Sequence, residues 1–258
     1  MSSIAFVGAG PGDAELITVK GARLLGEADV VVFAGSLVDR ELVRIHAPNA
    51  VVYDSAGMTL AETTQVLAEV AVAGQRAVRL HTGDPSIYGA IQEQMAELDQ
   101  LGIGYSVVPG VTSAFAAAAT LRQELTLPEV SQTVIITRLA GRTPVPERER
   151  LAEIARIGAT LVIYLSVSMI ERVVAELLQG AYTLATPVTV VARASWPDEQ
   201  VVEGTLADIA ARVQEAGIGK QALILVGDVL RARQEGLKAV SRLYDREFSH
   251  EFRSGIVA

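Results

Sequence analysis

The stretch Ser3-Ile4-Ala5-Phe6-Val7-Gly8-Ala9-Gly10-Pro11-Gly12-Asp13 places an apolar run with strand character directly before a glycine-rich turn. A helix is expected over Thr18–Glu27, so the segment has the strand–turn–helix order of an α/β protein. Glycines after a parallel strand let the backbone pass close to a ligand. The segment therefore indicates an α/β fold whose first turn borders a small-molecule site.

The turn departs from the dinucleotide-binding motif at its third glycine position. Gly8 and Gly10 fit G-x-G-x-x-G, but Asp13 occupies the third position, where its carboxylate would face a pyrophosphate. Pro11 also removes one backbone donor. No Gly-Lys-Ser/Thr follows, which excludes a P-loop. The turn indicates a ligand other than a phosphate, and an ordinary tight connection is the alternative.

Strand and helix patterns alternate along the rest of the chain. This order predicts two α/β domains with mainly parallel sheets: an N-terminal domain over residues 1–121, a linker over 122–131 and a C-terminal domain over 132–258. Gly74 is expected to end a helix over 59–73. Strands are expected at 29–33, 51–53, 76–80, 105–108, 133–137, 160–165, 188–192 and 222–226, with an antiparallel strand at 201–205. Further helices are expected at 87–101, 111–121, 147–156, 170–178 and 206–216.

Composition excludes several classes of function. Half of the 258 residues are hydrophobic and the net charge is -8, which argues against a nonspecific nucleic-acid binder. The chain has no cysteine and only three histidines, so we expect neither a thiolate nucleophile nor a protein-bound metal. No signal peptide and no apolar run of about 18–20 residues is evident. We expect a cytoplasmic protein that contacts no membrane.

Two further turns follow expected strands, at His81–Ser86 and at Pro109–Ser113. In open α/β sheets, ligands bind beyond the carboxyl ends of the strands. Each turn alone has the composition of an ordinary turn, since Gly, Pro, Asp and Ser dominate turns. The three turns together favour the rim of a pocket.

Together these turns resemble the tetrapyrrole methylase family, which uses S-adenosylmethionine. The resemblance runs from Val7 to Asp245 and is strongest to members that methylate precorrins in cobalamin biosynthesis. It is carried by the glycine turn and by the segments Phe33–Val38, His81–Ala90, Glu129–Thr133, Gly141–Glu147 and Ser195–Glu199.

The resemblance implies a homodimer of two-domain α/β chains, with the cofactor in the cleft between the domains and S-adenosylhomocysteine as its product. It also implies which residues bind the cofactor: Pro11, Thr82, Gly83, Asp84, Ile87, Thr112, Ser113, Leu165, Ala194 and Ala222. For Asp84, capping of the helix that begins near Pro85 is the structural alternative.

One departure concerns catalysis. The branch of the family that methylates uroporphyrinogen III carries a Tyr-Asp pair after its second strand, where this chain has Phe33 and Ala34. Its Gly-Lys-Arg segment is replaced near Asp54-Ser55-Ala56. That branch's general base therefore cannot be transferred to this chain, and no catalytic residue is assigned.

Precorrins carry many carboxylates, which arginine binds well. The candidate substrate contacts are Arg138, Arg142, His81 and Tyr88, with a solvated charged face as the alternative for the arginines and a core anchor for Tyr88. Three rival functions stay open: another methyltransferase of the family, a nicotinamide-dependent reductase, and a noncatalytic tetrapyrrole-binding subunit.

Overall fold

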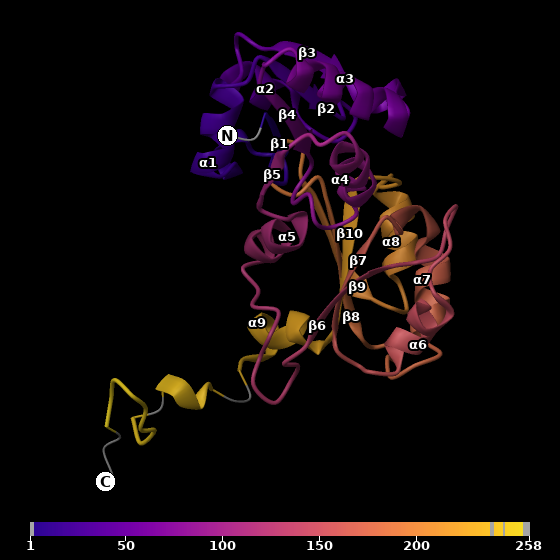
Figure 1. Ribbon diagram of the computed structural model, residues 1–258. Coiled ribbons are helices and arrows are strands. Elements are labelled where there is room, and N and C mark those ends of the chain that lie inside the picture. The colour runs from indigo at the N-terminus through magenta and orange to yellow at the C-terminus, as the bar shows by residue number, and fades with distance from the viewer. Residues whose placement is uncertain (1–2, 238–239, 245, 255–258) are drawn as a thin grey trace. The chain divides into compact units, whose positions relative to one another are not determined.

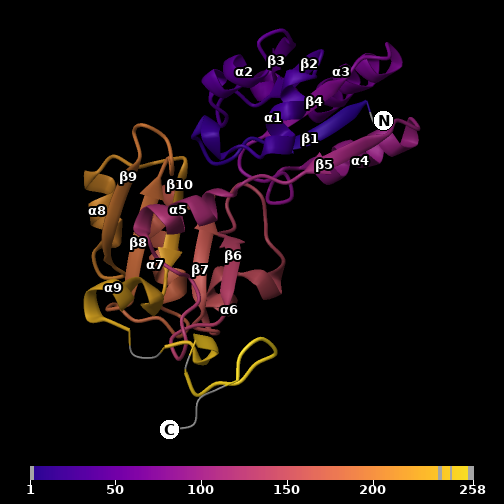
Figure 2. The same cartoon turned by 90° about the vertical axis from the view of Figure 1, so that its left-hand side faces the viewer.

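The computed structural model describes residues 3–237, 240–244 and 246–254 (Figures 1 and 2). The chain forms two compact units. One comprises Met1–Ala116 together with Arg193–Glu199, and the other comprises Ala117–Ala192 with Gln200–Ala258. Each unit is built on a five-stranded sheet with helices, so the α/β class expected from the sequence is confirmed.

The sheet of the first unit is entirely parallel, with the strand order β3-β2-β4-β1-β5. Every residue of the inner strand β1 is buried, which explains its continuous apolar sequence. The five strands are β1 (Ile4–Gly8), β2 (Val30–Phe33), β3 (Val51–Asp54), β4 (Ala77–His81) and β5 (Tyr105–Val108).

Alternate residues of these strands point to two separate cores. On one face, Ala5 and Val7 pack with Leu25 of α1 and Leu42 of α2. On the other face, Ile4 and Phe6 pack with side chains of α3 and α4. The helices are α1 (Val19–Gly26), α2 (Arg40–His46), α3 (Leu60–Val72) and α4 (Ile91–Gln100).

This arrangement fixes where a ligand can bind. The connections after β1 and β2 run to one face, while the connection after β4, which lies between them, runs to the other. The carboxyl end of β4 is therefore the switch point of the sheet, where ligands of open α/β folds bind.

Helix ends follow their local sequence. Thr18 begins α1 by accepting a hydrogen bond from the backbone N–H of Gly21, and Thr59 begins α3 in a capping box with Glu62. Gly74 follows α3 with φ +74°, which confirms the expected helix end. Helix α5 (Ser113–Leu121) continues from the first unit into the second.

The second unit has the strand order β6-β7-β10-β8-β9, and its core is formed by aliphatic side chains of the sheet and helices. The strands are β6 (Val134–Arg138), β7 (Thr160–Tyr164), β8 (Pro187–Ala192), β9 (Gln200–Thr205) and β10 (Ala222–Val226). The helices are α6 (Leu151–Ala155), α7 (Ile170–Leu177), α8 (Ile209–Glu215) and α9 (Ala232–Glu235).

The expectation of a mainly parallel second sheet is wrong. Only β6 and β7 pair in parallel, while β7–β10, β10–β8 and β8–β9 are antiparallel. The reason is that residues 193–199 join β8 to β9 without a helix and reverse the chain direction. The later strands β9 and β10 therefore run opposite to β6, β7 and β8, although α8 still joins β9 to β10 as a crossover.

The segment expected as a linker, residues 122–131, lies within the second unit. The hydroxyl of Thr160 donates a hydrogen bond to the carbonyl oxygen of Leu125 at 3.0 Å. The backbone N–H of Leu127 donates to the carbonyl oxygen of Ser131 at 2.8 Å. The first bond ties the segment to the start of β7, and the second closes a turn within the segment.

The three turns at the carboxyl edge of the first sheet interlock through their glycines. Gly10 and Gly83 exchange two backbone hydrogen bonds, of 3.3 and 2.8 Å. A Cβ atom on Gly8 would lie 2.6 Å from the Cα of Gly110, and one on Gly110 would lie 2.1 Å from the carbonyl oxygen of Gly83. The turns can approach this closely only because these residues lack side chains.

We expect Gly110→Ala to destabilise the protein by about 1–3 kcal/mol, because the added methyl group must push apart two backbone segments. Gly104→Ala is the matched control, since a Cβ there meets nothing within 4 Å. Chemical denaturation measures both variants, and equal free energies of unfolding would contradict the interlocked arrangement.

Candidate functional site

The glycine turn is held in place by the segment Arg193–Glu199. The indole N–H of Trp196 donates to the carbonyl oxygen of Pro11 at 2.9 Å, and a Cβ on Gly12 would lie 2.2 Å from the Trp196 ring. The backbone N–H of Asp13 donates to the hydroxyl of Ser195 at 3.1 Å. Trp196 therefore braces the turn, a role that its sequence context did not reveal.

Asp13 itself has a local role. Its carboxylate accepts a hydrogen bond from the backbone N–H of Glu15 at 2.9 Å and caps the short helix η1 (Ala14–Leu16). Gly10 has φ +81° and Pro11 is buried. The turn thus presents a rigid backbone without a charged side chain at its centre.

Asp84 joins two of the turns. One carboxylate oxygen accepts the backbone N–H of Ser86 at 2.8 Å, and the other accepts the backbone N–H of Gly110 at 2.8 Å. The first contact is local to the turn and caps no helix, because α4 begins only at Ile91, whereas the second contact fixes the turn after β5. Beside it, Thr82 is exposed and Thr112 is buried.

Strained backbone marks several of the expected site residues. Tyr88 and Leu165 have φ of +55° and +54°, and both neighbours of Ala194, namely Arg193 and Ser195, also have positive φ. Leucine and tyrosine rarely adopt this conformation, and such strain is concentrated at functional sites. The strain is consistent with ligand contacts at these positions.

A half-buried cation, Arg79, lies on β4 near the carboxyl edge of the first sheet. Arg79 donates hydrogen bonds to the carbonyl oxygen of Val32 (3.2 Å), the hydroxyl of Ser55 (3.0 Å) and the side-chain oxygen of Gln94 (3.3 Å). All three partners are uncharged, and burial lowers the pKa of Arg79 to about 10.

His81 lies beside Arg79 and faces the core. Its side chain is only 7% exposed and its ring centroid lies 5.9 Å from that of Phe6. Burial, and then the charge of Arg79, lower its pKa to about 3, so the ring is neutral. A neutral, buried ring cannot form an ion pair with a substrate carboxylate, and the contact between His81 and the substrate stays a prediction.

The two candidate arginines of the second unit differ in their hydrogen bonding. The guanidinium of Arg138 donates to the carbonyl oxygens of Thr143 at 3.1 Å and Pro144 at 2.6 Å, which closes the loop after β6. Arg142 at the tip of that loop is exposed and, among the described residues, forms no hydrogen bond or ion pair. Arg142 is therefore free to bind an anion.

Candidate residues of the second unit share one edge of its sheet. Arg138 ends β6, and Leu165 follows β7 with 67% of its surface exposed. Ala222 begins β10 opposite Ala192, the last residue of β8. Because β10 is antiparallel, its first residue lies at the same edge as the last residues of β7 and β8.

A hollow of about 660 Å³ in the first unit does not include these residues. It is lined by alanine, other aliphatic and polar side chains of α3 and α4 and of the residues that end these helices. It lies on helices rather than at the carboxyl edge of the sheet, so it is not the candidate site.

Over the described ranges, no group of three or more His, Asp or Glu side chains could hold a metal ion. Within the same residues, no helix is both long and apolar enough to cross a membrane.

The chain belongs to the tetrapyrrole (corrin/porphyrin) methylases, whose family model matches residues 3–210. The resemblance found in the sequence is thereby confirmed.

Among its relatives is a cobalt-precorrin-4 C(11)-methyltransferase of Methanocaldococcus jannaschii, 54% identical over 97% of this chain and 95% of the relative. A solved cobalt precorrin-4 methyltransferase of cobalamin biosynthesis is 47% identical, with a TM-score of 0.86, over 88% of this chain and 95% of that one. A uroporphyrin-III C-methyltransferase of Thermus thermophilus, solved with S-adenosylhomocysteine, is 32% identical with a TM-score of 0.74, over 89% of this chain and 99% of that one.

The neutral His81 makes stability depend on pH in a defined direction. Because its folded pKa of about 3 lies below the unfolded value of 6.5, its contribution is complete above about pH 6.5 and falls as the pH drops toward 3. By pH 5 the loss is about 2 kcal/mol. The free energy of unfolding of His81→Leu, measured by chemical denaturation at pH 7 and pH 5, should not show this loss. The control variant His46→Gln should show it as the wild-type protein does. Parallel curves for His81→Leu and the wild-type protein would disprove this assignment.

Proposed function

We propose that this protein transfers the methyl group of S-adenosylmethionine to carbon 11 of precorrin-4 in corrin ring (vitamin B12) biosynthesis. The substrate is precorrin-4 itself or its cobalt complex. The observation that carries the proposal is the 54% identity, over nearly the full length of both chains, to an enzyme named for this reaction.

The geometry of the interlocked turns supports S-adenosylmethionine as the cofactor. Gly8, Gly83 and Gly110 bring three backbone segments together at the switch point of the sheet, without side chains that would fill it. The residues proposed to bind it are those implied by the resemblance: Pro11, Thr82, Gly83, Asp84, Ile87, Thr112, Ser113, Leu165, Ala194 and Ala222. Pro11 is braced by Trp196, and Asp84 fixes the backbone of Gly110.

The cofactor supplies an electrophilic methyl group. The chain holds the two reactants in line and excludes water, and such orientation can contribute about 7–11 kcal/mol to lowering a barrier. Phe33 and Ala34 offer no acid or base at the end of β2. Catalysis in this proposal is therefore by positioning, without a protein nucleophile.

Arg142 is the proposed contact for a substrate carboxylate, since it is exposed and unpaired within the described residues. Arg138 acts through the loop by holding the carbonyl oxygens of Thr143 and Pro144. Tyr88 remains a proposed contact with the macrocycle: its side chain is exposed on a strained backbone.

We also propose a cytoplasmic homodimer. The outer strand β3 exposes Val51, Val52 and Tyr53 at the edge of its sheet, which is the kind of surface that a second copy covers. Sedimentation at micromolar concentration tests the dimer.

The deciding experiment incubates the purified protein with methyl-labelled S-adenosylmethionine and either precorrin-4 or cobalt-precorrin-4. We expect label at carbon 11 with at least one of them. Methylation of a different precorrin only would favour another enzyme of the family. Oxidation of a nicotinamide cofactor would favour a reductase, and tetrapyrrole binding without turnover would favour a noncatalytic subunit.

We expect Asp84→Ala to weaken the binding of S-adenosylhomocysteine by at least tenfold, because the N–H groups of Ser86 and Gly110 lose their acceptor and the turns loosen. Calorimetric titration measures the affinity. Asp208→Ala, which removes an exposed carboxylate that accepts hydrogen bonds from Thr205, is the control and should leave it unchanged. An unaltered affinity in Asp84→Ala would refute the proposed role.

A further inference from the structure

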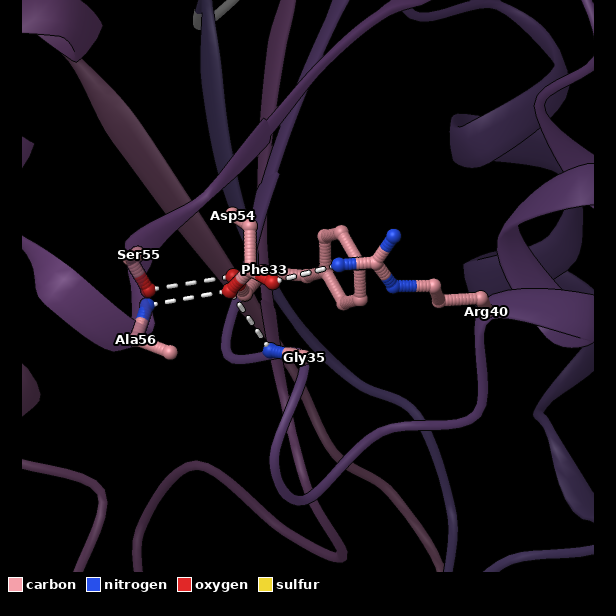
Figure 3. A network of polar contacts seen from close by, with 6 residues as sticks. All are labelled: Phe33, Gly35, Arg40, Asp54, Ser55 and Ala56. Atoms are coloured by element: carbon pink, nitrogen blue, oxygen red, sulfur yellow. Dashed lines mark hydrogen bonds and ion pairs between the residues drawn. The ribbon is translucent and has the colours of Figure 1, made fainter.

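A polar cluster, consisting of Phe33, Gly35, Arg40, Asp54, Ser55 and Ala56, lies at the carboxyl ends of β2 and β3 (Figure 3). At its centre is the carboxylate of Asp54. One oxygen accepts the backbone N–H groups of Gly35 and Ala56, both at 3.0 Å, and the other accepts a guanidinium N–H of Arg40 at 2.8 Å. Asp54 thus ties the end of β3 to the loop after β2 and to the start of α2.

The loop fits closely against this carboxylate. A Cβ on Gly35 would lie 2.3 Å from a carboxylate oxygen of Asp54, so no larger residue could keep this contact. The backbone hydrogen bonds from Ala56 and Gly35, and then the contact with Arg40, hold the pKa of Asp54 below its usual range. Asp54 is therefore charged at neutral pH and can orient a guanidinium.

Hydrogen bonds from the neighbouring strand β4 also hold the cluster in place. The hydroxyl of Ser55 donates to the carbonyl oxygen of Phe33 at 3.1 Å, and the half-buried Arg79 donates to that hydroxyl at 3.0 Å and to the carbonyl oxygen of Val32 at 3.2 Å. Arg79 therefore connects the end of β2 to the residue that follows β3.

The cluster lies on the same edge of the sheet as the glycine turns. In the order β3-β2-β4-β1-β5, β2 is two strands from β1, and neighbouring strands are about 4.8 Å apart. A broad ligand that starts at the glycine turns and extends past β4 therefore reaches the cluster after roughly 10 Å.

Asp54 orients the guanidinium of Arg40 but occupies only some of its N–H donors. The side chain of Arg40 is 74% exposed, and only one of its nitrogens contacts Asp54. The other guanidinium N–H donors are available to an anion in a fixed orientation. An exposed ion pair by itself adds little to stability, so a gain in stability does not account for the pairing of Arg40 with Asp54.

We propose that Arg40 is a specificity-determining residue that binds a carboxylate of the tetrapyrrole substrate, and that Asp54 is the positioning residue that aims it. This inference rests on the proposed function for the identity of the substrate. Arg40 lies on the first unit, which also carries the glycine turns.

The first test is the affinity of the S-adenosylhomocysteine-loaded protein for precorrin-4 and cobalt-precorrin-4, measured by absorbance titration. Arg40→Gln should raise the substrate Kd and the KM about tenfold, the loss of one charge-assisted hydrogen bond. The Kd for S-adenosylhomocysteine and kcat should stay within about twofold. Arg44→Gln is the matched control, because Arg44 lies one turn later on α2, is 73% exposed and pairs with Glu41; it should change none of these values.

The second test addresses positioning. Asp54→Asn keeps the shape of the side chain but loses its charge, and it should raise the same KM with kcat preserved. In the double variant, Asp54→Asn should raise the KM little beyond the value of Arg40→Gln alone, because both substitutions remove the same interaction with the substrate. Arg40→Lys should restore part of the affinity.

A substrate Kd in Arg40→Gln equal to that of Arg44→Gln would overturn the inference, as would a full additional loss in the double variant. The proposed function is judged separately, by methylation in the wild-type protein. If the wild-type protein binds precorrin-4 without methylating it, the proposed function fails, and the comparison of Kd values still decides the role of Arg40.

Discussion

The carboxylate of Asp84 accepts backbone hydrogen bonds from its own turn and from the turn after β5, and the geometry of the candidate site depends on this pair of contacts. The neighbouring Gly83 exchanges two hydrogen bonds with Gly10. The three turns on β1, β4 and β5 are thus one rigid unit at the switch point of the sheet. Rigidity of this kind suits a reaction that is accelerated by alignment of two bound molecules.

Charge is distributed in a way that suits an acidic substrate. The chain carries a net charge of -8, yet exposed guanidinium groups occur at Arg142 and Arg40. Local cations can attract an anion against an unfavourable overall charge. The half-buried Arg79 differs from both, because its donors bind Ser55, Gln94 and a backbone carbonyl, and it therefore helps to fix the position of the strand ends.

Much of the first unit could be predicted because its signals are local. The apolar run of β1, the glycine turn and the helix end at Gly74 are each specified within a few residues. Helix α2 was missed because it has only seven residues, and its start at Asp39 looks like part of a loop.

The remaining features depend on residues far apart in the sequence. The antiparallel strand expected at 201–205 is confirmed as β9, but the sequence did not show that β10 lies between β7 and β8 and runs antiparallel to both. The partner of Trp196 is 185 residues away, and Gly35 is 19 residues from Asp54. His81 was expected as a substrate contact, and the sequence could not show that its ring turns toward Phe6 and is buried.

The position of Trp196 allows a direct test of the cofactor site. It is the only tryptophan of the chain, and its indole contacts Pro11 and Gly12 in the glycine turn. Titration of the wild-type protein with S-adenosylhomocysteine should change the tryptophan emission in a saturable way, complete at one equivalent per chain, whereas NADPH should not. Calorimetric binding of S-adenosylhomocysteine without any change in emission, or a saturable response to NADPH, would contradict the assignment of this turn to the cofactor of a methyltransferase.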